Sequence, residues 1–421
     1  MWNELECYKN HFLQWRYPTF KAETLNEMVQ KEFKIQQYKH EICCFPHEEV
    51  ECNHSTYFDD RSKLAYGFWA LPQLMREACS DTSLTQWRAI NSLSELIMNP
   101  LEAQRAITEA DIVRKIQNIF LRKRHKYKLE YYREIEKMMQ IFYTVSLYLN
   151  GAQKMVIKRH LLKEFYIMIY NKEEYMEIAS KVLRNLSEKS KVLLHMLEET
   201  EAFDYLTTIF HKDECAQYYP LALWMHLSHF LEVSPERGIE RGFFELLHKR
   251  IVNRMPLYYE MNMKCFALLL QCADGQRMFD DVEGVKLMYR LFTKDAPLDT
   301  WEYVVLAFQN AIISKRTLWR CCEHMDIADI LVRLARPKSI IGQGDENQKE
   351  QYGEINTRLQ LYCLQALRKM GQMPRIKRYI HDVCLPGIRA IDCLNELNEC
   401  TRDDLVKWLK REIYHTEMEY Y

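Results

Sequence analysis

The sequence contains little glycine and little proline, with only 11 of each among 421 residues. A β-sandwich, a β-barrel or a disordered low-complexity chain uses more of both, so this composition argues against all three. Leu, Glu, Lys, Met and Arg are abundant instead, and these residues are good helix formers. The composition therefore predicts helices throughout the chain.

Long apolar runs and a net charge are also missing. No window approaches about 18 consecutive apolar residues, which a membrane span needs, and the N-terminus lacks the pattern of a signal peptide. The formal net charge of −1 gives no support for wholesale binding to nucleic acid or to a membrane surface. The 14 cysteines have no framework spacing and are expected to be reduced thiols that serve as small core residues.

Catalytic motifs are missing as well. The sequence has no GxSxG and no HExxH, and its one Gly-rich stretch, Gly342–Asn347, lacks the lysine and the helix context of a phosphate-binding loop. His195, His226 and His229 lie in apolar helical stretches and are interpreted as core or groove residues. We therefore expect neither an enzyme nor a bound cofactor.

What the chain does have is a period. Apolar residues at i, i+4 and i+7, one face of a helix, recur in triplets whose steps are 40 to 46 residues, with one final step of 59. The triplets are Ala89/Leu93/Leu96, Ile135/Met139/Phe142, Ala179/Leu183/Leu186, Leu223/Leu227/Phe230, Met263/Ala267/Leu270, Val304/Phe308/Ala311 and Cys363/Leu367/Met370.

Each triplet except the last is followed by a short polar turn and by two shorter helical patterns, which is typical of an armadillo-type unit of about 40 residues. One such unit cannot bury its own apolar face, so neighbouring units must cover it. The period predicts an all-α, armadillo-like α-solenoid superhelix of about seven three-helix repeats.

The same period sets the expected domain organisation. Residues 57–413 are predicted to form the repeat domain, with a polar loop insertion at about 337–357. Residues 1–56 form a partly helical N-terminal extension, and residues 414–421 form a C-terminal tail. The apolar stretch Lys63–Arg76 is expected to cap the first repeat, with Pro72 kinking or starting a helix.

The start of the repeat region resembles a known family. The stretches "LAYGFWALPQLM" and "TQWRAINSLSELIMNPLEAQRAI" are similar to the opening of the radial spoke head 14 family of armadillo-repeat proteins, over roughly Leu64–Ile107. Ile97 departs from the family, which usually has aspartate there. The matching residues are Ala65, Tyr66, Gly67, Ala70, Leu71, Leu74, Arg88, Ala89, Leu93, Leu96, Met98, Pro100 and Glu102.

This resemblance implies a non-enzymatic scaffold of the ciliary or flagellar axoneme that helps to build radial spokes and is required for motility of a cilium or sperm flagellum. The implied partners are other axonemal and radial spoke proteins, and the implied location is the cytoplasmic cytoskeleton. The alternative is a soluble armadillo adaptor that binds extended peptides, in the manner of importin-α or β-catenin relatives.

Three clusters are candidate sites. Cys43, Cys44, His47, Cys52 and His54 could in principle hold zinc, but their spacing matches no closed zinc pattern, so ordinary loop residues are the preferred interpretation.

The second cluster is a basic run with interleaved tyrosines. Its residues Arg122, Lys123, Arg124, Lys126 and Lys128 could bind acidic protein surfaces, tubulin tails among them. A solvated loop between repeats is the preferred reading, and nucleic acid is disfavoured because the net charge is close to zero.

The third cluster occupies the position where importin-α-like proteins carry a peptide-binding asparagine ladder. It holds Asn185, His229 and Asn310 as possible groove contacts, but two asparagines in seven repeats do not make a ladder. Satisfying backbone groups between repeats is the preferred interpretation of Asn185 and Asn310.

Overall fold

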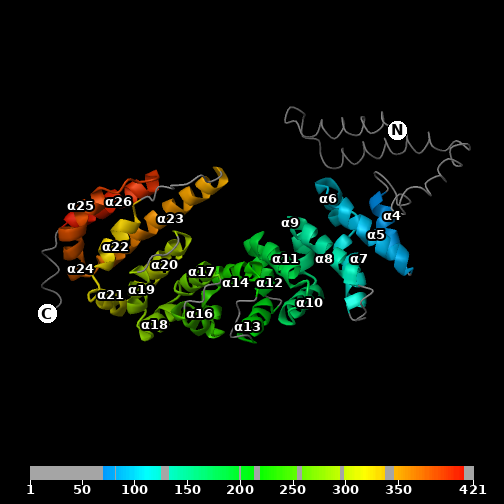
Figure 1. Cartoon of the computed structure of the whole chain (residues 1–421), viewed down its shortest axis with the longest axis horizontal. Helices are drawn as coiled ribbons and strands as arrows, with labels where there is room; N and C mark the ends of the chain where they lie inside the picture. Colours follow the sequence, from blue (N-terminus) through cyan, green and yellow to red (C-terminus); the bar gives the residue numbers. More distant parts are fainter. Residues whose placement is uncertain are drawn as a thin grey trace, which may run out of the picture. The chain divides into compact units, whose positions relative to one another are not determined.

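The computed structural model describes residues 70–80, 82–124, 132–198, 201–212, 219–253, 258–293, 298–336 and 346–411. Within these ranges every regular element is a helix, as Figure 1 shows, which confirms the predicted all-α class. The chain divides into two compact units between Met155 and Val156. The predicted ends of the repeat domain, at 57 and 413, lie outside the described residues.

The first unit is a run of short helices. They are α4 (Ala70–Ala78), α5 (Ser83–Leu96), α6 (Pro100–Thr108), α7 (Ile112–Arg124), α8 (Tyr132–Ser146) and α9 (Leu149–Val156), the last of which ends at the division between the units. The helix α4 packs on α5 and α7 through buried Leu71, Leu74 and Met75. Pro72 lies in its first turn, where a proline is tolerated. The described part of the predicted cap therefore covers the first repeat as expected.

The turn between α5 and α6 shows how local sequence ends one helix and begins the next. Ile97 follows α5 and is fully buried. Asn99 caps α6 by accepting a hydrogen bond from the Leu101 amide at 3.1 Å, and Pro100 occupies the first helical position. A side-chain cap followed by proline fixes a sharp helix start.

The second unit repeats this pattern. Its helices are α10 (Arg159–Tyr170), α11 (Met176–Glu188), α12 (Lys191–Glu198), α13 (Ala202–Lys212), α14 (Leu221–Val233), α15 (Pro235–Glu240), α16 (Phe243–Val252), α17 (Tyr259–Leu269), α18 (Ala273–Asp281), α19 (Gly284–Phe292), α20 (Leu298–Ala311), α21 (Lys315–Cys321), α22 (Ile327–Leu334), α23 (Glu346–Met370), α24 (Pro374–Tyr379), the π-helix η6 (Ile380–Cys384), α25 (Leu385–Arg389) and α26 (Glu396–Lys410).

Every third helix of the second unit packs on the next one in the series. The helices α11, α14, α17, α20, α23 and α26 contact one another in that order, and we call them the central row. The shorter helices between them pack against the same row, as α16 does on α17 and α22 on α23. Each repeat thus covers the apolar side of its neighbour, which is how a solenoid builds a core.

The apolar triplets fall on α5, α8 and the central row. All of their residues are buried except Leu96 and Ile135, which are partly exposed. In the second unit Leu183, Leu227 and Phe308 are fully buried. The predicted repeat period is therefore confirmed by the positions of these helices and by their burial.

The predicted loop insertion at 337–357 is wrong over its second half. The helix α23 begins at Glu346, so residues 346–357 are helical, whereas residues 337–345 lie outside the described residues. Glu, Gln and Lys favour a helix without forming an apolar stripe. The polar composition was therefore misread as a loop.

The helix α26 adds a member to the central row after the last triplet. Its Asn398 is fully buried and donates to the Thr357 carbonyl at 3.0 Å and to Oε1 of Gln360 at 2.8 Å. This contact between α26 and α23 is a layer of buried amides. A search for apolar triplets cannot find such a layer.

The described cysteines are all free thiols, and Cys265, Cys321 and Cys363 are buried in the helical core. These three agree with the expected use of cysteine as a small core residue. Cys79 and Cys400 do not, because both are exposed. Among the described helices, none combines the length and the apolar character that crossing a bilayer requires.

Candidate functional site

The central row carries partly exposed polar side chains on successive helices. Arg184 lies on α11, His229 on α14 and Lys264 on α17, and all three are partly exposed. They are close enough to interact: burial lowers the pKa of His229 most, and the charges of Lys264 and Arg184 lower it further. Three neighbouring repeats therefore contribute to one surface.

The same arrangement continues along the row. Tyr303 on α20 and Tyr362 on α23 are partly exposed and lie near each other and near Arg358. Burial raises the pKa of both phenols, so both are neutral donors at physiological pH. We call the partly exposed residues Arg184, His229, Lys264, Tyr303 and Tyr362 the row surface.

An ion pair between a buried carboxylate on α20 and a partly exposed arginine on α23 supports this surface. The Glu302 carboxylate is only 4% exposed, and it accepts from Arg358 Nε at 2.6 Å and from Arg358 Nη2 at 3.3 Å. Such a two-point contact fixes the planes of both groups. The hydrogen bond with Glu302 raises the pKa of Arg358, so the guanidinium stays charged throughout the physiological range.

Side chains of the row also bond to the backbone of the preceding row helix. Asn310 donates to the Ala267 carbonyl at 2.9 Å, and Lys369 donates to the Gln309 carbonyl at 2.8 Å. Asn310 thus satisfies a backbone group of the neighbouring repeat, as the preferred interpretation expected.

A hydrogen-bonded chain crosses from the core to the row surface. Tyr166 Oη lies 2.9 Å from His226 Nε2, and His226 Nδ1 lies 2.9 Å from Ser187 Oγ. The same hydroxyl lies 2.8 Å from His229 Nδ1. Tyr166 and His226 are fully buried, and burial lowers the pKa of His226 to about 3. The chain is therefore neutral at physiological pH.

The three residues at the asparagine-ladder position differ in accessibility. His229 belongs to the row surface and Asn310 is partly exposed, but Asn185 is 2% exposed and accepts from Arg184 Nη2 at 3.1 Å. A partner therefore cannot reach Asn185 in this conformation, because α11 packs that side chain into the unit. His229 is the one of the three that belongs to the row surface, and binding of a partner there stays a prediction.

The basic run differs from its expected exposure. Lys123 and Arg124 are buried at the end of α7, and Lys123 pairs with Glu134 of α8. Arg122 is exposed, and Lys126 and Lys128 lie outside the described residues. Lys123 therefore faces α8, where the Glu134 carboxylate supplies the opposite charge that a buried cation requires.

The cysteine and histidine cluster at Cys43, Cys44, His47, Cys52 and His54 also lies outside the described residues. Across the described part of the chain, no group of three or more histidine, cysteine or acidic side chains is arranged to hold a metal ion.

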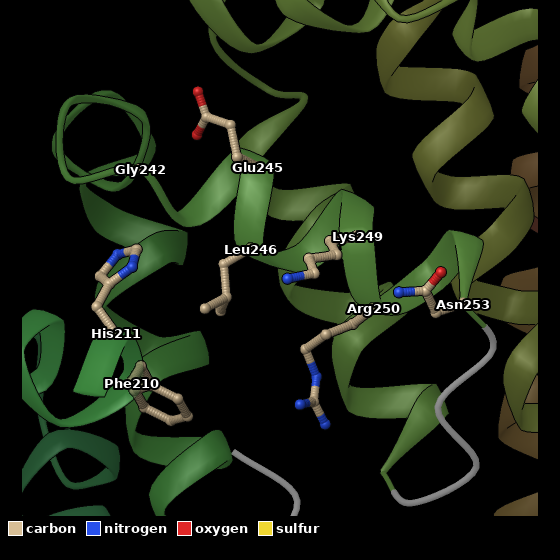
Figure 2. Close-up of a pocket in the computed structure, with 8 residues that line it drawn as sticks. All are labelled: Phe210, His211, Gly242, Glu245, Leu246, Lys249, Arg250 and Asn253. Carbon is tan, nitrogen blue, oxygen red and sulfur yellow. The ribbon is translucent and has the colours of Figure 1, made fainter. Parts of the chain in front are cut away.

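One pocket lies between α13 and α16. Figure 2 shows Phe210 and His211 of α13 facing side chains of α16 across it. Its volume is about 260 Å³, below the roughly 300–1,000 Å³ usual for small-molecule sites. Arg250 in its wall stacks over Trp224 at 4.9 Å and donates to Asn262 at 3.1 Å, so its guanidinium takes part in core packing.

Comparisons with known proteins support the fold. No family model matches the sequence, and none of the curated proteins shows significant similarity to it. An engineered protein known from its crystal structure is similar over 81% of this chain and 89% of its own, with a TM-score of 0.54 and 11% identity.

Two further solved structures are similar at lower scores. One, from work on a phosphorylation switch controlling the interaction between cadherin and β-catenin, covers 78% of this chain and 60% of that chain (TM-score 0.48, 12% identity). Computationally designed armadillo repeat proteins for modular peptide recognition are similar over 57% of this chain and 99% of their own (TM-score 0.46, 13% identity). At such identities the likeness concerns the fold alone, which is an all-α, armadillo-like solenoid.

Sequence reasoning missed most of the row surface. Tyr303 immediately precedes Val304, and Tyr362 immediately precedes Cys363. Val304 and Cys363 are each the first member of a triplet. The same register in two consecutive repeats was the available signal. Lys264 has no such signal, because its position depends on how α17 packs against α14.

Proposed function

We propose that this chain is a non-catalytic scaffold that docks a segment of a protein partner along the row surface. The observation that supports the proposal is that five successive helices of the central row each contribute one partly exposed polar side chain. Neighbouring helices of the central row contribute Arg184, His229, Lys264, Tyr303 and Tyr362, and the near neighbours among these influence one another electrostatically. Stacked repeats with one row in common offer the extended binding face that solenoids use.

The chemistry of this surface suits a protein segment. It combines two tyrosines, two cations and a neutral histidine, and tyrosine and arginine are enriched where proteins bind one another. The supporting ion pair of Glu302 and Arg358 holds α20 and α23 in register and so pre-organises the tyrosines.

We further propose that the partners are axonemal and that the chain is a radial spoke component required for motility of a cilium or sperm flagellum. The support is the sequence resemblance over Leu64–Ile107. Within its described part, Ala89 and Leu93 are core residues, and Pro100 starts a helix. Exposed Arg122 is a second contact for acidic protein surfaces, among them tubulin tails.

Tagging the full chain in multiciliated or spermatogenic tissue tests this proposal. The expected signal lies along the axoneme and survives detergent extraction. A diffuse or nuclear signal would reject the axonemal role and favour the soluble adaptor.

Two matched charge reversals test the docking surface in the same tissue. Lys264→Glu changes the row surface, whereas Lys286→Glu changes an exposed lysine of α19 that forms only a surface pair with Glu283. We expect Lys264→Glu to weaken retention on extracted axonemes and Lys286→Glu to leave it unchanged. Equal retention of both variants would contradict docking at the row surface.

A further inference from the structure

The hydrogen-bond donors and acceptors determine where the protons lie along the chain of Tyr166, His226, Ser187 and His229. Tyr166 has no other hydrogen-bond partner among the described residues, so its hydroxyl must donate to His226 Nε2. Otherwise its proton would be buried without an acceptor, which costs about 1–3 kcal/mol. His226 is neutral, so its single proton lies on Nδ1 and is donated to Ser187 Oγ.

The Ser187 hydroxyl decides the state of His229. It lies 2.9 Å from the Arg184 carbonyl, 2.9 Å from His226 Nδ1 and 2.8 Å from His229 Nδ1. A serine hydroxyl donates one hydrogen bond and accepts two. All three contacts are attractive only when Ser187 donates to the carbonyl and accepts from both imidazoles.

The opposite assignment leaves a repulsive contact. If Ser187 donated to His229 Nδ1, its oxygen would face the Arg184 carbonyl oxygen at 2.9 Å with no proton between them. The Arg184 carbonyl oxygen can only accept a hydrogen bond, so Ser187 must donate to it. The imidazole of His229 can carry its proton on either nitrogen and therefore adapts to the serine.

We propose that Ser187 holds His229 with its proton on Nδ1, so that His229 Nε2 is a fixed hydrogen-bond acceptor on the row surface for a backbone N–H of a docked extended segment. This inference rests on the proposed docking function and names its recognition chemistry. His229 occupies the asparagine-ladder position of its repeat. Of the other residues at that position in the second unit, Asn185 is buried, Leu269 is apolar, and Asn310 and Lys369 bond to carbonyls of the preceding row helix.

The charges around His229 keep Nε2 free of a proton. Lys264 of α17 and Arg184 of α11 oppose a positive ring, whereas Glu188 of α11 and Glu232 of α14 favour one. Burial is the largest influence and, together with the two cations, lowers the pKa of His229. Near neutral pH the row surface therefore presents an acceptor here, and acidification would replace it with a donor.

Nitrogen-15 spectroscopy of the full chain tests the assignment without any partner. Histidine-labelled protein is recorded at neutral pH, and the His229 signals are identified by their loss in His229→Gln. We expect a protonated Nδ1 and an unprotonated Nε2. Ser187→Ala should shift His229 towards the Nε2-protonated tautomer, whereas Tyr166→Phe should leave the His229 signals in place. A protonated Nε2 in the unsubstituted chain would overturn the proposal.

Random dodecapeptides displayed on phage and selected on the full chain test the recognition step. Peptides that cross-link to Lys264 are expected to bind His229→Ala at least tenfold more weakly, a loss of about 1.4 kcal/mol. They should bind His195→Ala as before, since His195 is an exposed histidine of α12. Unchanged binding to His229→Ala would refute the acceptor role and leave docking at the row surface intact. Failure to select any peptide would count against the docking function itself, with the tautomer still decided by spectroscopy.

Discussion

Gly275 offers the sharpest test of how closely α18 approaches the end of α17. It lies in the first turn of α18, and a Cβ added there would come within 2.1 Å of the Leu269 carbonyl oxygen and 2.9 Å of its carbonyl carbon. Both contacts are to backbone, so no side-chain rotation relieves them. Alanine at this position must therefore push α18 away from the end of α17.

The magnitude follows from two opposing effects. Overpacking of a tight site costs about 1–3 kcal/mol, and a clash with rigid backbone belongs at the upper end. Alanine recovers about 1 kcal/mol of helix propensity. We expect Gly275→Ala to lower the free energy of unfolding by about 2 kcal/mol.

Gly353 is the matched control. It lies inside α23 with nothing within 4 Å of an added Cβ. Gly353→Ala should therefore raise the free energy of unfolding by about 1 kcal/mol through helix propensity. Guanidinium denaturation of both variants, followed by the helical circular dichroism signal, measures the difference. Equal effects of the two substitutions, or a stabilised Gly275→Ala, would refute the close approach. In the first unit, a Cβ added at Gly151 would lie 2.2 Å from the Val145 carbonyl oxygen, so Gly151→Ala is expected to behave as Gly275→Ala does.

Three further substitutions probe contacts of the second unit. The pKa of His226 is about 3 in the folded chain, against 6.5 ordinarily. Between these two pH values the unfolded chain therefore binds one more proton than the folded chain, so the free energy of unfolding falls as the pH falls. His226→Gln should flatten this slope, by up to about 1.4 kcal/mol per pH unit, in urea titrations from pH 6.5 to 5, and parallel slopes would contradict it. Arg358→Met should lower the free energy of unfolding by about 2 kcal/mol, because it leaves the Glu302 carboxylate buried without its cation. In a Glu302→Gln background the same substitution should cost much less. Equal losses in both backgrounds would disprove the coupling. Asp280→Ala should cost about 2 kcal/mol in thermal or chemical denaturation, because it strips the acceptor from Thr317 and loosens α18 from α21; an unchanged midpoint would argue against that link.

The repeat architecture could be predicted because it depends on a local property. An apolar triplet at i, i+4 and i+7 marks one face of one helix, and Leu227 or Phe308 is buried for the reason the pattern indicates. The start of α23 could not be found in the same way. Residues 346–357 are polar, and a polar helix has the composition of a loop.

The site could be predicted only in part. His229 was found by its place in the repeat, but its proton depends on Ser187, which is 42 residues away in the chain. The sequence pattern favoured a solvated Lys123, whereas the structure pairs Lys123 with Glu134. Contacts of this kind depend on the register between helices, which the sequence pattern does not specify.

The central claim is that each repeat of the second unit is stabilised chiefly by its immediate neighbours. Phe308 of α20 is fully buried, and Phe308→Ala should cost about 3–5 kcal/mol. Hydrogen exchange of the full chain, read by mass spectrometry, should then show the largest loss of protection in α17, α20 and α23, with α11 nearly unchanged. A uniform loss of protection from α11 to α26 would contradict a core that is built repeat by repeat.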